Sequence, residues 1–387
     1  MSFASAGNTR KLRFAMVGGG PGSFIGPVHR IAAELDGQIE LVAGAFSSNA
    51  QRSAQAAAQY GIDPSRAYSD YETLLDRERE RTDPADLVAI VTPNHLHFPV
   101  AAAALACGYH VISDKPATAT LDEAQALAAH VADSDGLYAL TYTYTGYPMI
   151  RQARAMCASG ELGRIRKVVV EYVQGWLSQP IEADEQKQAA WRTDPARAGM
   201  GGCIGDIGVH AFNLVEFVTG ERVVKLCADL SAIVEGRRLD DDCNLLVRLA
   251  GGAPGVIHTT QIAAGERNGL AIRVFGEKGS LAWEQEEPNR LRVSWPDRPT
   301  QIFHAGASYL AASAVSACRL PPGHPEGYLE AFANLYRDFA ASIRARASGA
   351  SDECGLVNGI EAGVRSMRFV EVAVAASRAG RGWVAMD

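Results

Sequence analysis

Three side chains in this sequence have the chemistry of a proton-transfer site acting on a hydroxyl group. Lys115 stands in Asp114-Lys115-Pro116, and Asp206 and His210 are four residues apart further along the chain. Oxidising a secondary alcohol requires a general base within hydrogen-bond reach of the hydroxyl proton. His210 is the better base by its intrinsic pKa near neutrality, which predicts an activity limb near that pH. Lys115 can stabilise the alkoxide, and is a base only if its pKa is lowered.

Asp206 lies one helical turn before His210, on the same face of a predicted helix over 206–218. It is predicted to bind a neighbouring hydroxyl group or to orient the substrate ring and the imidazole. The alternatives are structural, because Asp206 can cap a helix that begins at Ile207 and a lysine before a proline is usually a surface residue. The spacing alone leaves both interpretations open.

The elements that must position these residues alternate between strands and helices in the first third of the chain. Apolar runs predict strands at 12–17, 39–46, 87–91, 109–113 and 137–141, with helical spacing at 27–36, 50–60, 97–107 and 121–134. This alternation predicts a parallel sheet covered on both faces, with ligands bound at the carboxyl ends of the strands. Lys115 stands at such an end.

A glycine-rich loop, Gly18 to Gly26, follows the first predicted strand. Glycines let the backbone turn sharply and approach a pyrophosphate, whose charge then faces the start of a helix. The usual G-x-G-x-x-G spacing is stretched, since Gly18 and Gly20 fit but the third glycine is Gly26, three residues late. We predict that this loop, including Gly22, binds a dinucleotide; a simple turn is the alternative.

The end of the second predicted strand bears on the choice of cofactor. An NAD-selective site usually places an acidic side chain there to hold the ribose hydroxyls, and none is present. Ser47, Ser48 and Arg52 can accept a 2′-phosphate instead, because a guanidinium pairs well with phosphate oxygens. A helix cap at Ser48 or Asn49 followed by a surface arginine fits equally well, so NAD and NADP both remain open.

The order of these motifs resembles the glucose–fructose oxidoreductase / inositol dehydrogenase (Gfo/Idh/MocA) family. The motifs are Gly26-x-x-His29 in the glycine loop, Thr92-Pro93-Asn94-x-x-His97, Asp114-Lys115-Pro116, Gly160-Glu161-Leu162-Gly163 and Asp206-x-x-x-His210. The resemblance covers nearly the whole chain, to 330–335. Glu-Lys-Pro is the family's commoner form, and Asp114 is a conservative variant of it.

The resemblance implies an α/β protein with an N-terminal Rossmann domain at 10–143 and a C-terminal α/β domain at 144–387 with an open, mainly antiparallel sheet. It implies NAD(P)-dependent oxidation of a secondary hydroxyl of a sugar, cyclitol or sugar derivative, in a homodimer or homotetramer packed through that sheet. Lys115, Asp206 and His210 are expected at the reacting centre. The expected cofactor contacts beyond the glycine loop and the second strand are Thr92, Asn94, His97, Asp114 and Lys115.

The second half of the chain is compatible with this architecture on its own terms. Strand-like runs occur at 164–174, 223–234, 243–250, 255–263, 270–275 and 280–284. The absence of helical spacing between them predicts an antiparallel sheet. Predicted helices at 148–159, 206–218 and 326–346 would cover one of its faces.

Substrate contacts are predicted from aromatic and cationic side chains, because aromatic faces pack against sugar rings and a guanidinium grips hydroxyls or an anionic substituent. The candidates are Tyr144, Trp176, Trp191, Arg192, Asp206 and His210, with His324 as a further possibility. Interface packing is the alternative for each aromatic residue. Many family members carry an Asn-x-Arg-like element near 142–146 that is replaced here by Tyr142-Thr143-Tyr144-Thr145-Gly146, so the sugar stays unnamed.

Composition argues against several other classes of protein. The 387 residues carry a net charge of −7 without a basic tract that would follow nucleic-acid phosphates. No run approaches a membrane span, and the first ten residues have no apolar signal-peptide core. Seven cysteines without C-x-x-C spacing predict free thiols in a reducing cytoplasm, and no metal is expected.

Two other functions fit the same motifs. A redox-neutral glycosidase of this family oxidises a hydroxyl, eliminates the aglycone, adds water and reduces again with tightly held NAD. A cofactor-binding sensor would keep the fold without catalysis, although it need not keep Lys115, Asp206 and His210. Net release of NADH from a sugar separates the dehydrogenase from the glycosidase.

Overall fold

Five parallel strands form the first sheet of the computed structural model, which describes residues 10–184, 186–351 and 356–387. The strands are β1 (Leu12–Gly18), β2 (Ile39–Ala45), β3 (Leu87–Val91), β4 (His110–Ser113) and β5 (Tyr138–Leu140), in the order β2-β1-β3-β4-β5. The helices between them are α1 (Ile25–Glu34), α2 (Ala50–Tyr60), α3 (Tyr71–Arg79), α4 (His97–Ala106) and α5 (Leu121–Asp133). The order reverses between β1 and β3, which opens a crevice at their carboxyl ends.

Alternate residues of the first sheet pack into two separate hydrophobic cores, because successive side chains of a strand point to opposite faces. Ala15 and Val17 of β1 join the core that contains Val100 of α4. Phe14 and Met16 join the core that contains Val28 of α1. The sheet is therefore covered on both faces, as the near-continuous apolar runs predicted.

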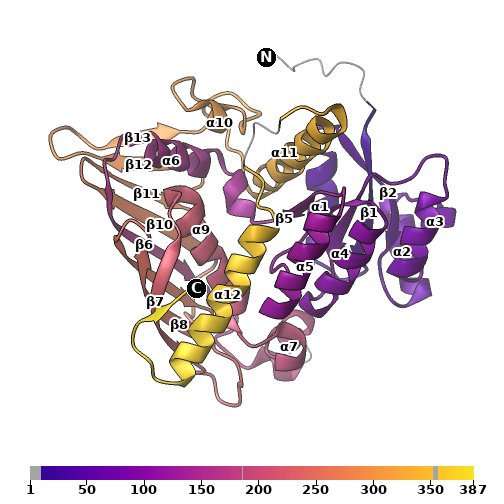
Figure 1. Cartoon of the computed structure of the whole chain (residues 1–387), viewed down its shortest axis with the longest axis horizontal. Helices are drawn as coiled ribbons and strands as arrows, with labels where there is room; N and C mark the ends of the chain where they lie inside the picture. The colour runs from indigo at the N-terminus through magenta and orange to yellow at the C-terminus, as the bar shows by residue number, and fades with distance from the viewer. Residues whose placement is uncertain (1–9, 185, 352–355) are drawn as a thin grey trace.

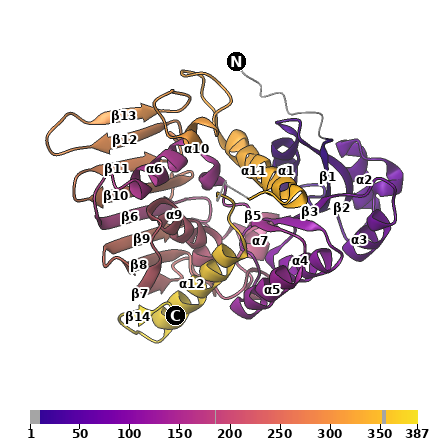
Figure 2. The same ribbon diagram turned by 45° about the horizontal axis from the view of Figure 1, so that its top comes forward.

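Nine strands form the second, mostly antiparallel sheet, drawn beside the first in Figures 1 and 2. They are β6 (Ile165–Val173), β7 (Val223–Ser231), β8 (Asp242–Leu249), β9 (Pro254–Thr260), β10 (Gly269–Gly276), β11 (Ser280–Glu284), β12 (Arg290–Ser294), β13 (Gln301–His304) and β14 (Val384–Ala385). Among the described strand pairs of this sheet, only β6 and β9 run parallel. This pairing places their carboxyl ends next to each other.

Three helices cover one face of the second sheet: α6 (Pro148–Ala158), α9 (Val209–Thr219) and α12 (Ile360–Arg378). The strands alternate between buried and more exposed residues, as in β8, so the opposite face is open. The predicted fold class, an α/β protein with a parallel and a mainly antiparallel sheet, is confirmed. Assembly of the protein into a homodimer or homotetramer through the open face of this sheet stays a prediction.

Two C-terminal helices join the second half of the chain to the first. Helix α11 (Tyr328–Ser348) packs against α1, and α12 packs against α5. His29, from the Gly26-x-x-His29 motif, is fully buried at the first contact, with its Nδ1 atom 2.7 Å from the hydroxyl oxygen of Tyr336. His29 therefore connects α1, the helix that follows the glycine-rich loop, to α11. The division of the chain at residues 143 and 144 stays a prediction.

Within the described part of the chain, no helix is both long and apolar enough to cross a membrane. Six cysteines there are free thiols, and Cys354 lies outside the described residues. Cys203, Cys243 and Asp240 lie close together, but the Asp240 carboxylate accepts hydrogen bonds from the backbone N–H groups of Gly202 (2.8 Å) and Ile204 (2.7 Å). Asp240 therefore caps the turn that begins beside Cys203.

Candidate active site

A cleft of about 1280 Å³ lies where the carboxyl ends of the first sheet face the second half of the chain. Its walls include the loops after β1, β2, β3 and β4 and the segments after β6 and β9. Most of the predicted cofactor residues line it: Gly18, Gly20, Ser47, Ser48, Arg52, Thr92, Asn94, Asp114 and Lys115. Asp206 and His210 line it as well, so one cleft holds both the predicted cofactor residues and the residues predicted at the reacting centre.

The glycine loop has no room for side chains where it crosses the crevice. A Cβ atom on Gly18 would lie 2.7 Å from the carbonyl oxygen of Val91, and one on Gly20 would lie 2.4 Å from that of Phe46. Gly22 and Gly26, two other glycines of the loop, have roles that differ from the predicted contact with the cofactor. Gly26 packs against Gly19, which lets α1 approach the loop, and Gly22 forms a turn with φ +80°. Neither of them lines the cleft.

His97 also needs correcting as a predicted cofactor contact. Its ring is buried, with Nδ1 2.6 Å from the carbonyl oxygen of Pro116 and Nε2 2.9 Å from that of Thr92. His97 therefore ties the loop after β3 to the segment after Lys115. Asn94 does line the cleft, and its Nδ2 atom donates to the carbonyl oxygen of Ala198 at 3.4 Å.

The crevice has the features that a dinucleotide requires. Gly20 lines the cleft shortly before the start of α1, where the N-terminus of a helix can face a pyrophosphate. The Oγ1 atom of Thr92 is buried in the cleft wall without a hydrogen-bond partner in the described structure, so a ligand can satisfy it. The residues present therefore fit a nicotinamide dinucleotide.

Lys115 is held in the cleft by hydrogen bonds of its backbone N–H group and of its side-chain ammonium group. The Asp114 carboxylate accepts hydrogen bonds from the Lys115 backbone N–H and from the Thr141 hydroxyl, both at 2.9 Å. The Lys115 ammonium donates to the backbone carbonyl oxygen of Asp206 at 2.6 Å and to its Oδ1 atom at 3.0 Å. The fold thus brings together two residues that are 91 positions apart.

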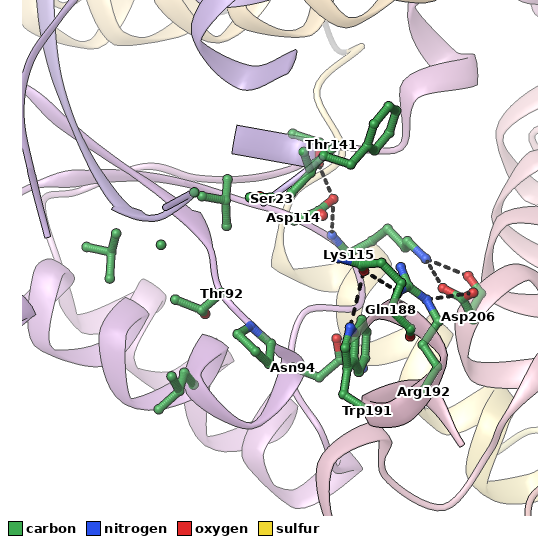
Figure 3. Close-up of a pocket in the computed structure, with 18 of the residues that line it drawn as sticks. Ser23, Thr92, Asn94, Asp114, Lys115, Thr141, Gln188, Trp191, Arg192 and Asp206 are labelled. Atoms are coloured by element: carbon green, nitrogen blue, oxygen red, sulfur yellow. Dashed lines mark hydrogen bonds and ion pairs between the residues drawn. The ribbon is translucent and has the colours of Figure 1, made fainter. Parts of the chain in front are cut away.

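Asp206 lies between two cations, as Figure 3 shows. Lys115 approaches its Oδ1 atom, and the Nε atom of Arg192 donates to its Oδ2 atom at 3.1 Å. Burial alone would raise the pKa of the Asp206 carboxyl, but Lys115 and Arg192 outweigh burial and hold that pKa well below its usual value. Asp206 is therefore a permanent carboxylate that orients the lysine, rather than a proton carrier.

His210 stands in an aromatic cage at the start of α9, one turn after Asp206 in a π-helical segment (Ile204–Gly208). The rings of Tyr142, Tyr144 and Tyr172 meet it edge-on, with centroids 5.5–5.8 Å away. Its Nδ1 atom is buried without a hydrogen-bond partner in the described structure, and the residue lines the cleft. Burial, with a smaller effect of Lys115, lowers the pKa of His210 well below its usual value.

The predicted substrate residues divide into two groups. Trp176, Trp191 and Arg192 line the cleft, with the guanidinium carbon of Arg192 4.2 Å from the ring centroid of Trp191. The hydroxyl of Tyr144 is already used, because it donates to the Oδ1 atom of Asn213 at 2.9 Å, so Tyr144 offers the cleft only part of its ring. His324 is exposed outside the cleft, with Nδ1 3.2 Å from the carbonyl oxygen of Pro321.

Sequence reasoning missed the amide side chains of the cleft. Gln174, Gln188, Asn268 and Gln285 all line it, and Gln261 lies directly behind Asp206. Gln174 and Gln261 each follow the last residue of a strand, whereas the predicted strands at 164–174 and 255–263 included both residues. The pairing of β6 with β9, strands more than 80 residues apart, was not visible in the sequence.

The fold and the cleft together define an NAD(P)-dependent dehydrogenase, with a doubly wound nucleotide-binding sheet and a second α/β unit closing the site. Residues 12–142 match the model described as the oxidoreductase family with an NAD-binding Rossmann fold, and residues 150–282 match a GFO/IDH/MocA C-terminal domain. The chain therefore belongs to the Gfo/Idh/MocA family of oxidoreductases, as the motif order predicted.

Solved structures and curated proteins agree with this assignment. The chain is similar to an inositol dehydrogenase homolog from Azotobacter vinelandii complexed with NAD⁺ (39% identity, 97% of this chain and 98% of that one, TM-score 0.94). The same homolog complexed with NADH and myo-inositol gives 38% identity, the same coverage and a TM-score of 0.91. An uncharacterized oxidoreductase of Bacillus subtilis is 35% identical over 97% of each chain.

Proposed function

We propose that this protein oxidises a secondary hydroxyl group of a sugar, a cyclitol or a related cyclic polyol. The single observation that carries the proposal is that Lys115 and His210 line the same cleft, with Lys115 hydrogen-bonded to Asp206, which lies one helical turn before His210. The tryptophans on the same wall support a ring-shaped substrate, because aromatic faces pack against sugar rings. The solved complex of a homolog with NADH and myo-inositol supports the same substrate class.

When bound, the nicotinamide supplies the hydride acceptor. The remaining chemistry falls to the side chains of the chain. The Lys115 ammonium, held in place by Asp206, donates a hydrogen bond to the reacting oxygen and stabilises the developing alkoxide. The Nε2 atom of His210 takes the hydroxyl proton, and its lowered pKa keeps it neutral and ready to do so at physiological pH.

A screen of cyclic polyols and sugars with NAD⁺ and NADP⁺ tests the proposal directly. We expect NADH or NADPH to accumulate with at least one cyclic polyol, in proportion to the substrate consumed. Glycosides should be included, because cleavage of a glycoside without net NADH release would replace the dehydrogenase by the redox-neutral glycosidase. Cofactor binding without turnover of any substrate would contradict both activities and favour a sensor.

We propose that Arg52 contributes to the choice between the two cofactors. Its guanidinium lies over the glycine loop, donating to the carbonyl oxygen of Pro21 at 3.2 Å, and it lines the cleft beside Ser47 and Ser48. Asn49 caps α2 by accepting from the backbone N–H of Arg52, so the capping alternative is real and coexists with a cleft-facing guanidinium.

If Arg52 pairs with a 2′-phosphate, Arg52→Ala should weaken NADP⁺ binding by about 1.5–3 kcal/mol, the range for a charged hydrogen bond, and leave NAD⁺ binding nearly unchanged. Calorimetric titration with each cofactor measures the difference. Arg77→Ala, an exposed arginine on α3, is the matched control. Equal losses for the two cofactors, or none, would make Arg52 an ordinary helix-surface residue.

A further inference from the structure

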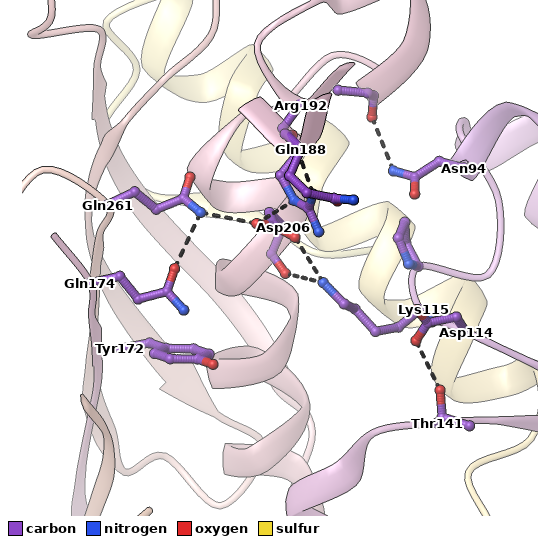
Figure 4. Close-up of polar contacts among 12 residues, drawn as sticks. Asn94, Asp114, Lys115, Thr141, Tyr172, Gln174, Gln188, Arg192, Asp206 and Gln261 are labelled. Atoms are coloured by element: carbon purple, nitrogen blue, oxygen red, sulfur yellow. Dashed lines mark hydrogen bonds and ion pairs between the residues drawn. The ribbon is translucent and has the colours of Figure 1, made fainter. Parts of the chain in front are cut away.

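A chain of polar side chains runs from Asp206 along the cleft wall, away from Lys115 (Figure 4). The Nε2 atom of Gln261 donates to the Oδ2 atom of Asp206 at 2.9 Å and lies 3.4 Å from the Oε1 atom of Gln174. The Nε2 atom of Gln174 then donates to the Oδ1 atom of Asn268 at 2.8 Å. The Tyr172 hydroxyl donates to the same Oδ1 atom at 2.7 Å.

The parallel pairing of β6 with β9 builds this chain. Gln174 follows β6, Gln261 follows β9, and the Gln174 backbone N–H donates to the carbonyl oxygen of Thr260 at 2.8 Å. Asn268 directly precedes β10, which pairs with β6 at the same edge. Gln174 therefore meets Gln261 and Asn268, more than 80 residues further along the chain, at one end of the second sheet, facing the segment that carries Asp206.

The direction of each hydrogen bond in this chain is fixed by its surroundings. An amide can be turned by 180°, so its oxygen and nitrogen must be assigned from groups that only accept or only donate. Asp206 is ionised and only accepts, so Gln261 must present its N–H₂ group to it. The indole of Trp176 only donates, and it donates to the Oε1 atom of Gln174 at 3.0 Å.

The consequence is a cleft wall of defined polarity. With its oxygen facing Trp176 and Gln261, Gln174 must present its N–H₂ group to Asn268. The Asn268 oxygen receives two hydrogen bonds, and its own N–H₂ group remains as a donor at the cleft. The Asn268 N–H₂ group at this position can donate a hydrogen bond to a hydroxyl oxygen of a bound sugar or cyclitol ring.

Gln261 controls this arrangement without reaching a substrate. Only 2% of its surface is exposed, and it is not part of the cleft wall. Its amide nitrogen supplies hydrogen bonds to both Asp206 and Gln174, so one group holds the carboxylate and shares the Gln174 oxygen with the Trp176 indole. Loss of that group leaves the Gln174 oxygen with a single donor, Trp176, and loosens the orientation of Gln174 and Asn268.

We propose that Gln261 is a positioning residue that couples the reacting centre to substrate selection. It holds the Asp206 carboxylate for Lys115, and together with Trp176 it holds Gln174 so that Asn268 donates to one particular hydroxyl oxygen of the substrate ring. This inference rests on the proposed oxidation of a cyclic polyol.

Gln261→Met tests the proposal, because methionine has a similar length and volume but no amide donor. With the best polyol from the screen, we expect kcat/KM to fall about 10-fold or more, while the affinity for NADH, measured by fluorescence titration, stays unchanged. The decisive readout is a panel of deoxy analogues. One deoxy analogue will show the largest decrease in activity, relative to the parent polyol, with the wild-type enzyme. With Gln261→Met, the decrease for this same analogue should be much smaller.

Gln261→Glu provides a second, pH-dependent test. A protonated carboxyl can still donate to Asp206, whereas an ionised one faces a like charge. The ionisable groups around it are Asp206, Lys115, Arg192 and His210. We expect the activity of Gln261→Glu, divided by that of the wild type, to fall as pH rises from 6 to 8. A residue with only a packing role would give a constant ratio.

Thr260→Val is the matched control, since it changes the neighbouring residue at the end of β9 without altering a contact of Asp206. It should keep the wild-type selectivity among the deoxy analogues. Wild-type selectivity and kcat/KM in Gln261→Met would overturn the inference about Gln261 alone. A wild-type enzyme that oxidises no polyol would instead overturn the proposed function, and this inference with it.

Discussion

Lys115→Ala and His210→Ala are each expected to lower turnover by about 10²-fold or more, the usual scale for an oxyanion donor or a positioned base. The Lys115 ammonium is held in the cleft by both the carboxylate and the backbone carbonyl oxygen of Asp206. His210 lines the same cleft within its cage of three tyrosine rings. Steady-state kinetics with the best polyol measures both losses.

The two substitutions should leave cofactor affinity nearly unchanged, because the glycine loop is built by other residues. Their effects on kcat should be less than additive in the double variant, since groups that serve one transition state fail together. His324→Ala, which removes an exposed imidazole outside the cleft, is the matched control and should behave as the wild type.

The pH dependence separates the roles of the two residues. A base must be neutral to accept a proton, and burial lowers the pKa of His210. The value of kcat/KM for oxidation should therefore hold as pH falls through 6.5 and decrease only at lower pH, and this acidic limb should vanish in His210→Ala. Near-normal turnover with the same limb in His210→Ala would move the base to Lys115 and leave His210 as a hydrogen-bond partner.

Local patterns were sufficient to predict the first sheet. Its five predicted strands and four predicted helices appear within about two residues of the expected bounds, because strand runs and helical spacing alternate cleanly there. Helix α3 was missed, because its Leu74 and Leu75 are flanked by charged residues that obscure the apolar face. The second sheet was predicted up to β11, whereas the short strand β12 and the edge strands β13 and β14 were not.

The motif spacing was sufficient to predict that Lys115, Asp206 and His210 lie together in one cleft, but it did not predict the electrostatic state of these residues. Asp206 is held ionised by Lys115 and by Arg192, which comes from the short helix α7 (Lys187–Arg192) and was expected to touch only substrate. Three residues that were predicted to contact the cofactor do not line the cleft: Gly22, Gly26 and His97. They shape or brace the loops of the crevice, and sequence spacing does not distinguish a bracing residue from a contacting one.

Gly20→Asp is expected to weaken binding of the nicotinamide dinucleotide by several kcal/mol, by two effects that act together. The added carboxylate would place a negative charge close to the negatively charged pyrophosphate, and the two charges would repel each other. In addition, a Cβ atom at this position would lie 2.4 Å from the carbonyl oxygen of Phe46, so the loop must move away from β2. Calorimetric titration with NAD⁺ and NADP⁺ measures the loss.

Two comparisons make the result specific to the loop. Gly382→Asp adds the same charge where a Cβ atom meets nothing within 4 Å, and it should leave cofactor affinity unchanged. Gly20→Ala introduces the close contact without the charge, so the difference between the two Gly20 variants isolates the electrostatic part. Since both cofactors share the pyrophosphate, each Gly20 variant should weaken NAD⁺ and NADP⁺ equally, in contrast to Arg52→Ala. Unchanged affinity in Gly20→Asp would mean that the dinucleotide does not bind at this loop.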